Sequence, residues 1–208
     1  MEPQFLFLVA PPRLLVAFGL GALPFAWLLV RAAKGIDVRT IGSGNAGATN
    51  ASRAFEGKAA RTAAFLAIYL LDAAKGFLAV QVGSPSLWLG VACALAAVLG
   101  HVFSPFLRFR GGKGVATATG ALFALDWQVT AIALIVFFVV RLLTGQVFFG
   151  SLALGLALPV AAIALHPDAA FAARLPLTAL CAVLAAFLVW THRSNLRKHF
   201  AARAARSP

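Results

Sequence analysis

The chain has 208 residues, of which 62% are hydrophobic and only 12% are charged. A soluble globular domain is about half apolar and about a quarter charged, so this composition excludes an ordinary soluble protein. The net charge of +12 suits either nucleic acid or an anionic membrane surface, and the long apolar segments exclude nucleic acid as the partner.

Seven apolar stretches are candidates for membrane helices. They cover residues 14–30, 62–82, 87–107, 114–126, 128–143, 147–165 and 175–191. Because a helix needs about 20 residues to cross the hydrocarbon core, segment 128–143 is marginal and segment 114–126 is short. The short one is expected to be a tilted or re-entrant helix that protein surrounds. We therefore predict an all-α integral membrane bundle of seven transmembrane helices, built as a single domain over residues 1–208.

Prolines and cysteines add detail to this prediction. Pro24, Pro105 and Pro159 are expected to kink or end helices, because proline lacks a backbone N–H. Cys93 and Cys181 each lie within an apolar run, so buried free thiols are expected. The first segment has neither a basic leader nor a small-residue cleavage site and is interpreted as a retained helix.

A polar, glycine-rich string, IGSGNAGATNASR, follows the first segment at residues 41–53. Gly42, Gly44 and Gly47 fit the GxGxxG pattern of dinucleotide-binding folds. No strand precedes them, however, and no acidic residue follows at a suitable place, which argues against that fold. What remains is a loop whose amide groups can turn toward an anion.

The residues between these glycines carry hydrogen-bonding groups and one positive charge. Ser43, Asn45, Thr49 and Asn50 are uncharged donors and acceptors, and Arg53 can bind phosphate through two parallel hydrogen bonds. A helix is expected to start here with Thr49 as its N-cap, which places Asn50 and Arg53 on one face. The string predicts a phosphate-binding loop; a polar interfacial loop that is glycine-rich for packing is the alternative.

The second and third segments each contain polar residues at membrane depth. Asp72 and Lys75 lie three residues apart, and a buried ion pair that positions the helix is the favoured interpretation. His101 ends the third segment. It is a candidate substrate-binding residue, although a structural bond to a backbone carbonyl is favoured.

The string RFRGGKG at residues 108–114 contains a lysine flanked by glycines. It is not a Walker A loop, because no Ser or Thr follows the lysine. Gly111, Gly112, Lys113 and Gly114 can still place an ammonium group and several amides around one phosphate. The alternative is an ordinary basic loop between two spans.

His192 and Asn195 lie three residues apart at the end of the last segment, so they can face one pocket, and His199 follows one turn later. An idle side chain at the interface is the alternative for His192.

The placement of lysine and arginine predicts the orientation in the membrane. Only Arg13 and Arg174 lie on the side that carries few positive charges. The opposite side carries Arg31, Lys34, Arg39, Arg53, Lys58, Arg61, Arg108, Arg110, Lys113, Arg141, Arg193, Arg197, Lys198, Arg203 and Arg206. With seven spans, the N-terminus is then outside and the C-terminus cytoplasmic, and every glycine-rich loop faces the cytoplasm.

In this order, the three motifs resemble those of the PlsY family of membrane glycerol-3-phosphate acyltransferases. The resemblance covers nearly the whole chain, including LLDAAKG around Asp72 and LGH at residues 99–101. It implies transfer of a fatty acyl group from a long-chain acyl phosphate to the hydroxyl of glycerol 3-phosphate, which gives lysophosphatidic acid. It further implies a multi-pass protein of the bacterial plasma (inner) membrane in contact with membrane lipid. The soluble enzyme that makes acyl phosphate is a candidate partner.

Site residues follow from the resemblance position by position. The catalytic set it implies is Ser43, Arg53, Lys113, His192 and Asn195. The substrate-binding set is Gly42, Gly44, Asn45, Thr49, Asn50, Gly111, Gly112, Gly114 and His101. The third motif departs from the family pattern, because Thr191 stands where an arginine is usual before the histidine, Lys198 replaces a later arginine, and a glutamate near the tail is missing.

Three mechanisms are compatible with these residues. The phosphate of the substrate can take the hydroxyl proton while the protein positions the pair, which is favoured; alternatively, His192 is the base. Ser43 as a covalent nucleophile is the third option, disfavoured because no His–acid partner is evident.

Other classes of protein fit less well. A transporter would place polar groups at the midplane within an inverted repeat, and a scaffold that binds anionic lipid would not need the Ser/Asn/Gly loop. No cofactor is expected, and no metal either, because no Cys/His cluster has zinc spacing.

Overall fold

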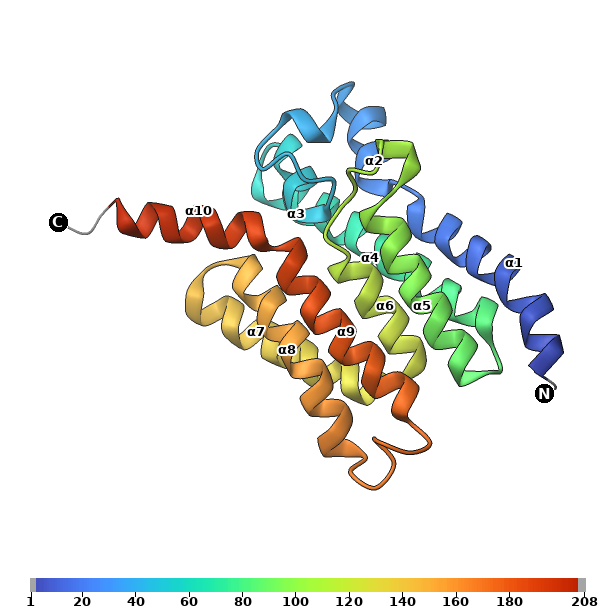
Figure 1. Ribbon diagram of the computed structural model, residues 1–208. Helices are drawn as coiled ribbons and strands as arrows, with labels where there is room; N and C mark the ends of the chain where they lie inside the picture. The colour runs from blue at the N-terminus through green and yellow to red at the C-terminus, as the bar shows by residue number, and fades with distance from the viewer. Residues whose placement is uncertain (1–2, 206–208) are drawn as a thin grey trace. The chain divides into compact units, whose positions relative to one another are not determined.

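In the computed structural model, the backbone of residues 3–205 and the side chains of residues 9–205 are described. Every regular element among them is a helix (Figure 1), as the all-α prediction requires. Internal contacts divide the chain into two compact units, Met1–Leu125 and Asp126–Pro208. The single domain expected over residues 1–208 stays a prediction, and Arg206 lies outside the described residues.

Over residues 3–125, the first unit contains six α-helices and three short 3-10 helices. The α-helices are α1 (Pro3–Ala22), α2 (Phe25–Lys34), α3 (Ala48–Ala51), α4 (Lys58–Gly83), α5 (Leu87–Val102) and α6 (Val115–Leu125); the 3-10 helices are η1 (Val38–Thr40), η2 (Ser52–Ala54) and η3 (Pro105–Leu107). Helix α4 packs against α1, α5 and α6, and α1 packs against α5. The loops with both glycine-rich strings belong entirely to this unit.

The first apolar segment is broken, as the proline at its centre predicts. Helix α1 ends at Ala22 and α2 begins at Phe25, because Pro24 cannot donate the next helical hydrogen bond. The carbonyl groups exposed by the break find partners on other helices. Ser104 Oγ donates to the carbonyl oxygen of Ala22 at 2.6 Å, and Lys75 Nζ donates to that of Leu23 at 2.8 Å.

The predicted ion pair inside the second segment is confirmed. Lys75 Nζ lies 2.8 Å from Asp72 Oδ1, and both side chains are 3% exposed. His101 Nδ1 lies 3.6 Å from the same oxygen. Charges at membrane depth are costly unless they are paired, and here each charged group has a partner. Because the partners come from different helices, the cluster ties α4 to α5 and to the break between α1 and α2.

Helices α4 and α6 touch backbone to backbone at two glycines. A Cβ at Gly76 would collide with the carbonyl oxygen of Thr117, and a Cβ at Gly120 would collide with that of Ala73. Membrane helices without a hydrophobic driving force between them rely on such close approach.

Replacing Gly120 with alanine should therefore destabilise the protein by about 1–3 kcal/mol, the usual cost of overpacking. The matched control is Gly19→Ala on α1, where a Cβ meets nothing within 4 Å. Since alanine is the better helix former, the control should be neutral or slightly stabilising. Thermal unfolding in detergent measures both variants, and equal midpoints would contradict the close packing of α4 on α6.

The second unit contains α7 (Trp127–Thr144), α8 (Val147–Leu165), α9 (Leu175–Thr191) and α10 (Arg193–Ala204). Helix α8 packs against α7 and α9. Asp126 is the N-cap of α7, since its carboxylate accepts from the amides of Gln128 at 2.9 Å and Val129 at 3.0 Å. The same carboxylate pairs with Arg174. Helix α10 was not predicted, because its polar sequence has no apolar run.

Five helical segments in the described residues are long and apolar enough to cross a membrane, or six if α9 and α10, bent by 49°, form one span. Segment 128–143, marginal in the sequence, is the 18-residue helix α7 and passes this test, whereas α6 stays a shorter apolar helix. Helix α8 runs through Pro159 without ending, and η3 begins at Pro105 after α5 has ended.

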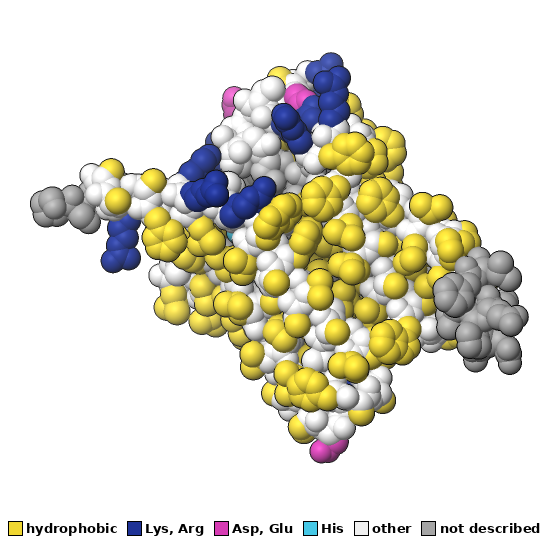
Figure 2. All heavy atoms as spheres, in the orientation of Figure 1, with side chains coloured by type: hydrophobic (Ala, Val, Ile, Leu, Met, Phe, Trp, Pro, Cys, Tyr) yellow, Lys and Arg dark blue, Asp and Glu magenta, His cyan; other side chains and the backbone are white. Residues whose placement is uncertain are grey.

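In Figure 2, hydrophobic side chains cover most of the helical surface in view, and Lys and Arg gather over the loops of the first unit and along α10. Cys93 and Cys181 are buried free thiols, as expected.

Candidate functional site

The loop of residues 41–53 is built around the buried side chain of Asn50, which is 2% exposed. Its Oδ1 accepts from the amide of Ser43 at 2.9 Å. Its Nδ2 donates to the carbonyl oxygens of Val38 at 2.9 Å and Ile41 at 3.0 Å. One amide side chain thus holds three backbone groups of the same loop, so Asn50 shapes the loop from within.

Alanines in this string anchor the loop to the helices beneath it. Ala46, Ala48 and Ala51 are buried in a cluster with side chains of α2, α4 and η3, including Val30, Ile68 and Leu107. Ser43, Gly44, Thr49 and Arg53 are exposed, and Asn45 is half-buried. The small apolar residues therefore face inward and the polar ones other than Asn50 face outward, as a binding loop requires.

Arg53 lies against the backbone of the loop. Gly42 has a φ of +54°, and a Cβ there would collide with Asn50 Oδ1 and lie 2.8 Å from Arg53 Nη1. Asn50 and Arg53 thus meet the same point of the loop, which confirms their predicted common face. Among the described residues, the Arg53 guanidinium has no hydrogen bond or ion pair, so it is available to an anion.

The prediction that Thr49 caps a helix is wrong. Helix α3 is a single turn, Ala48–Ala51, with Gly47 as its N-cap and no side-chain cap. The amides of Asn50 and Ala51 both donate to the carbonyl oxygen of Gly47 at 3.0 Å. The helix therefore starts before Thr49, which lies inside it.

The second glycine-rich loop folds back onto the end of α5. The amide of Gly111 donates to the carbonyl oxygen of Val102 at 3.0 Å, and the amide of Gly112 donates to that of His101 at 3.2 Å. A Cβ at Gly111 would collide with the carbonyl oxygen of His101, and one at Gly112 with His101 Nε2. These positions therefore need glycine, and Lys113 follows, half-buried, just before α6.

His101 contacts this loop and the buried carboxylate at the same time. Its side chain is 7% exposed, with Nδ1 facing Asp72 and Nε2 against Gly112. These contacts give His101 a structural role, but its partner is the carboxylate of Asp72 rather than the backbone carbonyl that the sequence favoured. A contact between His101 and substrate stays a prediction.

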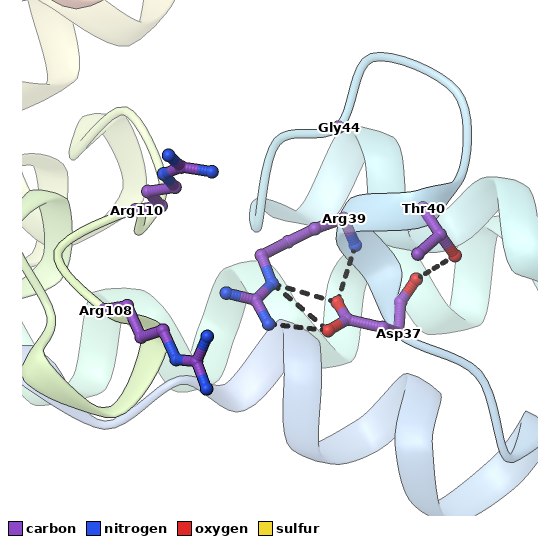
Figure 3. A pocket seen from close by; sticks show the side chains of 6 residues that line it. All are labelled: Asp37, Arg39, Thr40, Gly44, Arg108 and Arg110. Atoms are coloured by element: carbon purple, nitrogen blue, oxygen red, sulfur yellow. Dashed lines mark hydrogen bonds and ion pairs between the residues drawn. The ribbon is translucent and has the colours of Figure 1, made fainter.

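Arg39 joins the two loops. Its Nη1 donates to the carbonyl oxygen of Leu107 at 3.1 Å, while Nε and Nη2 bind the carboxylate of Asp37, at 2.6 Å for the Nη2–Oδ2 pair (Figure 3). Hydrogen bonds from Arg39 hold the pKa of Asp37 well below its usual range, and Asp37 raises the pKa of Arg39. Both loops thus lie at the same end of the first unit. The bridge was not predicted, since a bond across 68 positions leaves no local pattern in the sequence.

The third motif lies in the second unit, at the bend between α9 and α10. His192 is 3% exposed, and its Nδ1 lies 2.8 Å from the carbonyl oxygen of Leu188. Because a carbonyl can only accept, Nδ1 carries the proton, and Nε2 is the nitrogen able to accept one. The amide of Asn195 donates to the carbonyl oxygen of His192 at 2.9 Å. His199 packs against Phe148, Phe149 and Phe200.

The first unit thus brings two of the three predicted motifs together, and the approach of His192 and Asn195 to them stays a prediction. Over the described part of the chain, no group of three or more His, Cys, Asp or Glu residues could hold a metal ion.

Comparison with known proteins gives consistent matches. A family model described as glycerol-3-phosphate acyltransferase matches residues 13–202. A glycerol-3-phosphate acyltransferase of Myxococcus xanthus is 40% identical over 186 residues, covering 88% of this chain and 91% of the relative. One from Aromatoleum aromaticum is 42% identical over 188 residues, covering 89% and 90%.

Two solved structures are also similar. Both are crystal structures of PlsY, an integral membrane glycerol 3-phosphate acyltransferase. The glycerol 3-phosphate form has a TM-score of 0.80 and 30% identity, and the lysophosphatidic acid form has a TM-score of 0.76 and 28% identity. Each comparison covers 93% of both chains.

Proposed function

The chain belongs to the glycerol-3-phosphate acyltransferase family, and we propose that it takes its acyl group from acyl phosphate. The ester bond forms between the acyl carbon and a hydroxyl oxygen of glycerol 3-phosphate. The bond from that carbon to the phosphate oxygen breaks, inorganic phosphate leaves, and lysophosphatidic acid is the product. The observation that supports a phosphate-bearing substrate is the loop around Asn50, which presents Arg53, unpaired among the described residues, beside the backbone of Gly42. The choice of acyl phosphate as donor rests on the resemblance of the three motifs to the PlsY family.

Both substrates are anionic, so the site must hold two phosphate groups. Arg53 suits a planar, bidentate phosphate contact, and Lys113 supplies a compact positive charge. The exposed hydroxyl groups of Ser43 and Thr49 can donate further hydrogen bonds. Donors fixed in advance by the fold also stabilise the charge that develops on the acyl carbonyl oxygen.

The hydroxyl proton of the acceptor passes to a phosphate oxygen of the substrate while the protein positions the two reactants. His192 is the alternative base, because its contact with the carbonyl oxygen of Leu188 places a proton on Nδ1 and makes Nε2 the nitrogen that would accept the hydroxyl proton. A change at His192 that raises KM for glycerol 3-phosphate supports positioning, whereas a collapse of kcat at unchanged KM supports a base.

The setting of the reaction is a bacterial inner membrane. We place the loops on the cytoplasmic side of seven spans, with the N-terminus outside, because lysine and arginine crowd the side that carries these loops. There the loops meet soluble glycerol 3-phosphate, and the long acyl chain of the donor remains in the bilayer. The soluble enzyme that makes acyl phosphate would deliver the donor to the same face.

The test is release of inorganic phosphate by the purified full-length protein supplied with palmitoyl phosphate. We expect release that depends on glycerol 3-phosphate and persists in EDTA, because no metal is expected in the site. Turnover with palmitoyl-CoA but not with palmitoyl phosphate would contradict acyl phosphate as the donor, while acyl transfer to glycerol 3-phosphate would still hold. Loss of activity in EDTA, restored by a divalent ion, would contradict metal independence.

A further inference from the structure

A pocket in the first unit has a lining unlike that of a transmembrane interior. Its volume is about 510 Å³, and it is lined by Asp37, Arg39, Thr40, Gly44, Arg108 and Arg110 (Figure 3). This volume lies within the range of about 300–1,000 Å³ that small-molecule sites occupy. Three of the lining residues are arginines that no step of the proposed transfer uses.

The charges in this pocket are unequally compensated. The guanidinium of Arg39 is paired with Asp37 and bonded to Leu107, so its charge is balanced and its position fixed. The guanidinium groups of Arg108 and Arg110 have no hydrogen bond or ion pair with the described residues. The pocket therefore has a net positive charge that comes from two side chains two positions apart.

The backbone places both of these arginines at the pocket. Arg108 and Phe109 have φ angles of +53° and +60°, a conformation that residues other than glycine rarely adopt. The amide of Arg108 donates to the carbonyl oxygen of Pro105 at 3.0 Å, and that of Phe109 to Ser104 at 2.9 Å. The turn is thus held by hydrogen bonds, and both flanking arginines reach one cavity.

The chemistry of the lining suits an anion such as a phosphate group. Two guanidinium groups offer paired donors in a planar arrangement that matches the oxygens of a phosphate monoester. The same loop carries Phe106, 66% exposed, and Phe109, 64% exposed. Basic side chains with exposed aromatic ones beside them are typical of contact with the headgroup region of a bilayer.

We infer that the arginine pocket binds the phosphate-monoester headgroup of an anionic lipid. The lipid headgroup enters between Arg108 and Arg110, and the aromatic side chains of the loop contact its glycerol and the tops of the acyl chains. This site uses different side chains from Arg53 and Lys113, and goes beyond the proposed transfer reaction.

The test is isothermal titration calorimetry on the full-length protein in neutral detergent, without acyl donor, so that its result does not depend on turnover. The probes are dihexanoyl phosphatidic acid, inorganic phosphate and dihexanoyl phosphatidylcholine. The R108Q/R110Q variant should bind phosphatidic acid at least about tenfold more weakly, because two charge-assisted contacts are lost. The control R31Q/K58Q removes the same charge from exposed residues of the same unit and should stay within about twofold of the unchanged protein.

Two further variants distinguish binding in the arginine pocket from binding at the loop of Arg53 and from attraction by charge alone. R108K/R110K keeps the charge but loses the planar fork, and its affinity should fall between the unchanged protein and the glutamine variant. Arg53→Ala should leave the affinity of the pocket for phosphatidic acid intact. The inference is overturned if the control loses as much affinity as R108Q/R110Q, if Arg53→Ala abolishes binding, or if phosphatidylcholine binds equally well. If inorganic phosphate binds as tightly as phosphatidic acid, the pocket recognises a free phosphate ion and the assignment to a lipid headgroup is overturned.

Discussion

Replacing Arg53 with alanine is expected to lower kcat/KM for acyl transfer by about 100-fold or more, because removal of one well-placed donor in a charged transition state has effects of this size. Arg53 lies against Gly42 and has no hydrogen bond or ion pair among the described residues. The loss should therefore come from substrate contacts rather than from the fold. Release of inorganic phosphate from palmitoyl phosphate measures the effect, and the thermal midpoint should not change.

Two variants sharpen this expectation. Arg53→Lys keeps the charge but not the bidentate geometry, so its activity should lie between those of the alanine variant and the unchanged protein. Lys58→Ala removes an exposed positive charge at the start of α4 and should leave activity near its normal level. If Lys58→Ala loses as much activity as Arg53→Ala, general charge at the membrane surface is responsible and the specific role of Arg53 is wrong.

Local patterns predicted the local parts of this structure. Apolar runs located the long helices, since a continuous apolar run of about 20 residues can cross a membrane as a helix that satisfies its own backbone hydrogen bonds. The spacing of Asp72 and Lys75 predicted their ion pair, because residues three apart on a helix lie on one face. The common face of Asn50 and Arg53 was predicted for the same reason.

What the sequence did not predict depends on contacts between distant residues or on backbone geometry. The bond from Arg39 to Leu107 joins two loops that no spacing rule connects. Thr49 was assigned as a cap from its side chain, but the carbonyl oxygen of Gly47 starts that helix. The pocket of Arg108 and Arg110 depends on two consecutive left-handed residues, neither of them glycine, and residue type alone argues against such a turn.

The isosteric change Asn50→Asp is expected to damage the first loop more than Asn50→Ala does. The amide nitrogen of Asn50 donates to the carbonyl oxygens of Val38 and Ile41. A carboxylate in its place would turn an acceptor toward two acceptors, in a position only 2% exposed. A charged oxygen held against two carbonyl oxygens costs more than the loss of neutral hydrogen bonds, each of which is worth about 1 kcal/mol. We expect a lower thermal midpoint and a kcat/KM lowered by about 100-fold or more, since the loop amides can no longer be aligned.

The pH dependence of Asn50→Asp tests the cause. Burial raises the pKa of an introduced carboxyl group. The loss of folding stability that the buried carboxylate causes is therefore present at high pH and is relieved as the pH falls through that pKa. The protonated form can donate one of the two lost hydrogen bonds. Stability of the aspartate variant relative to Asn50→Ala should therefore increase as the pH is lowered. The control Ser52→Ala removes a side-chain hydrogen bond of 3.2 Å at a half-buried position of the same segment and should show no such trend. A difference between the aspartate and alanine variants that does not change with pH would mean that Asn50 does not hold the loop through its two donated hydrogen bonds.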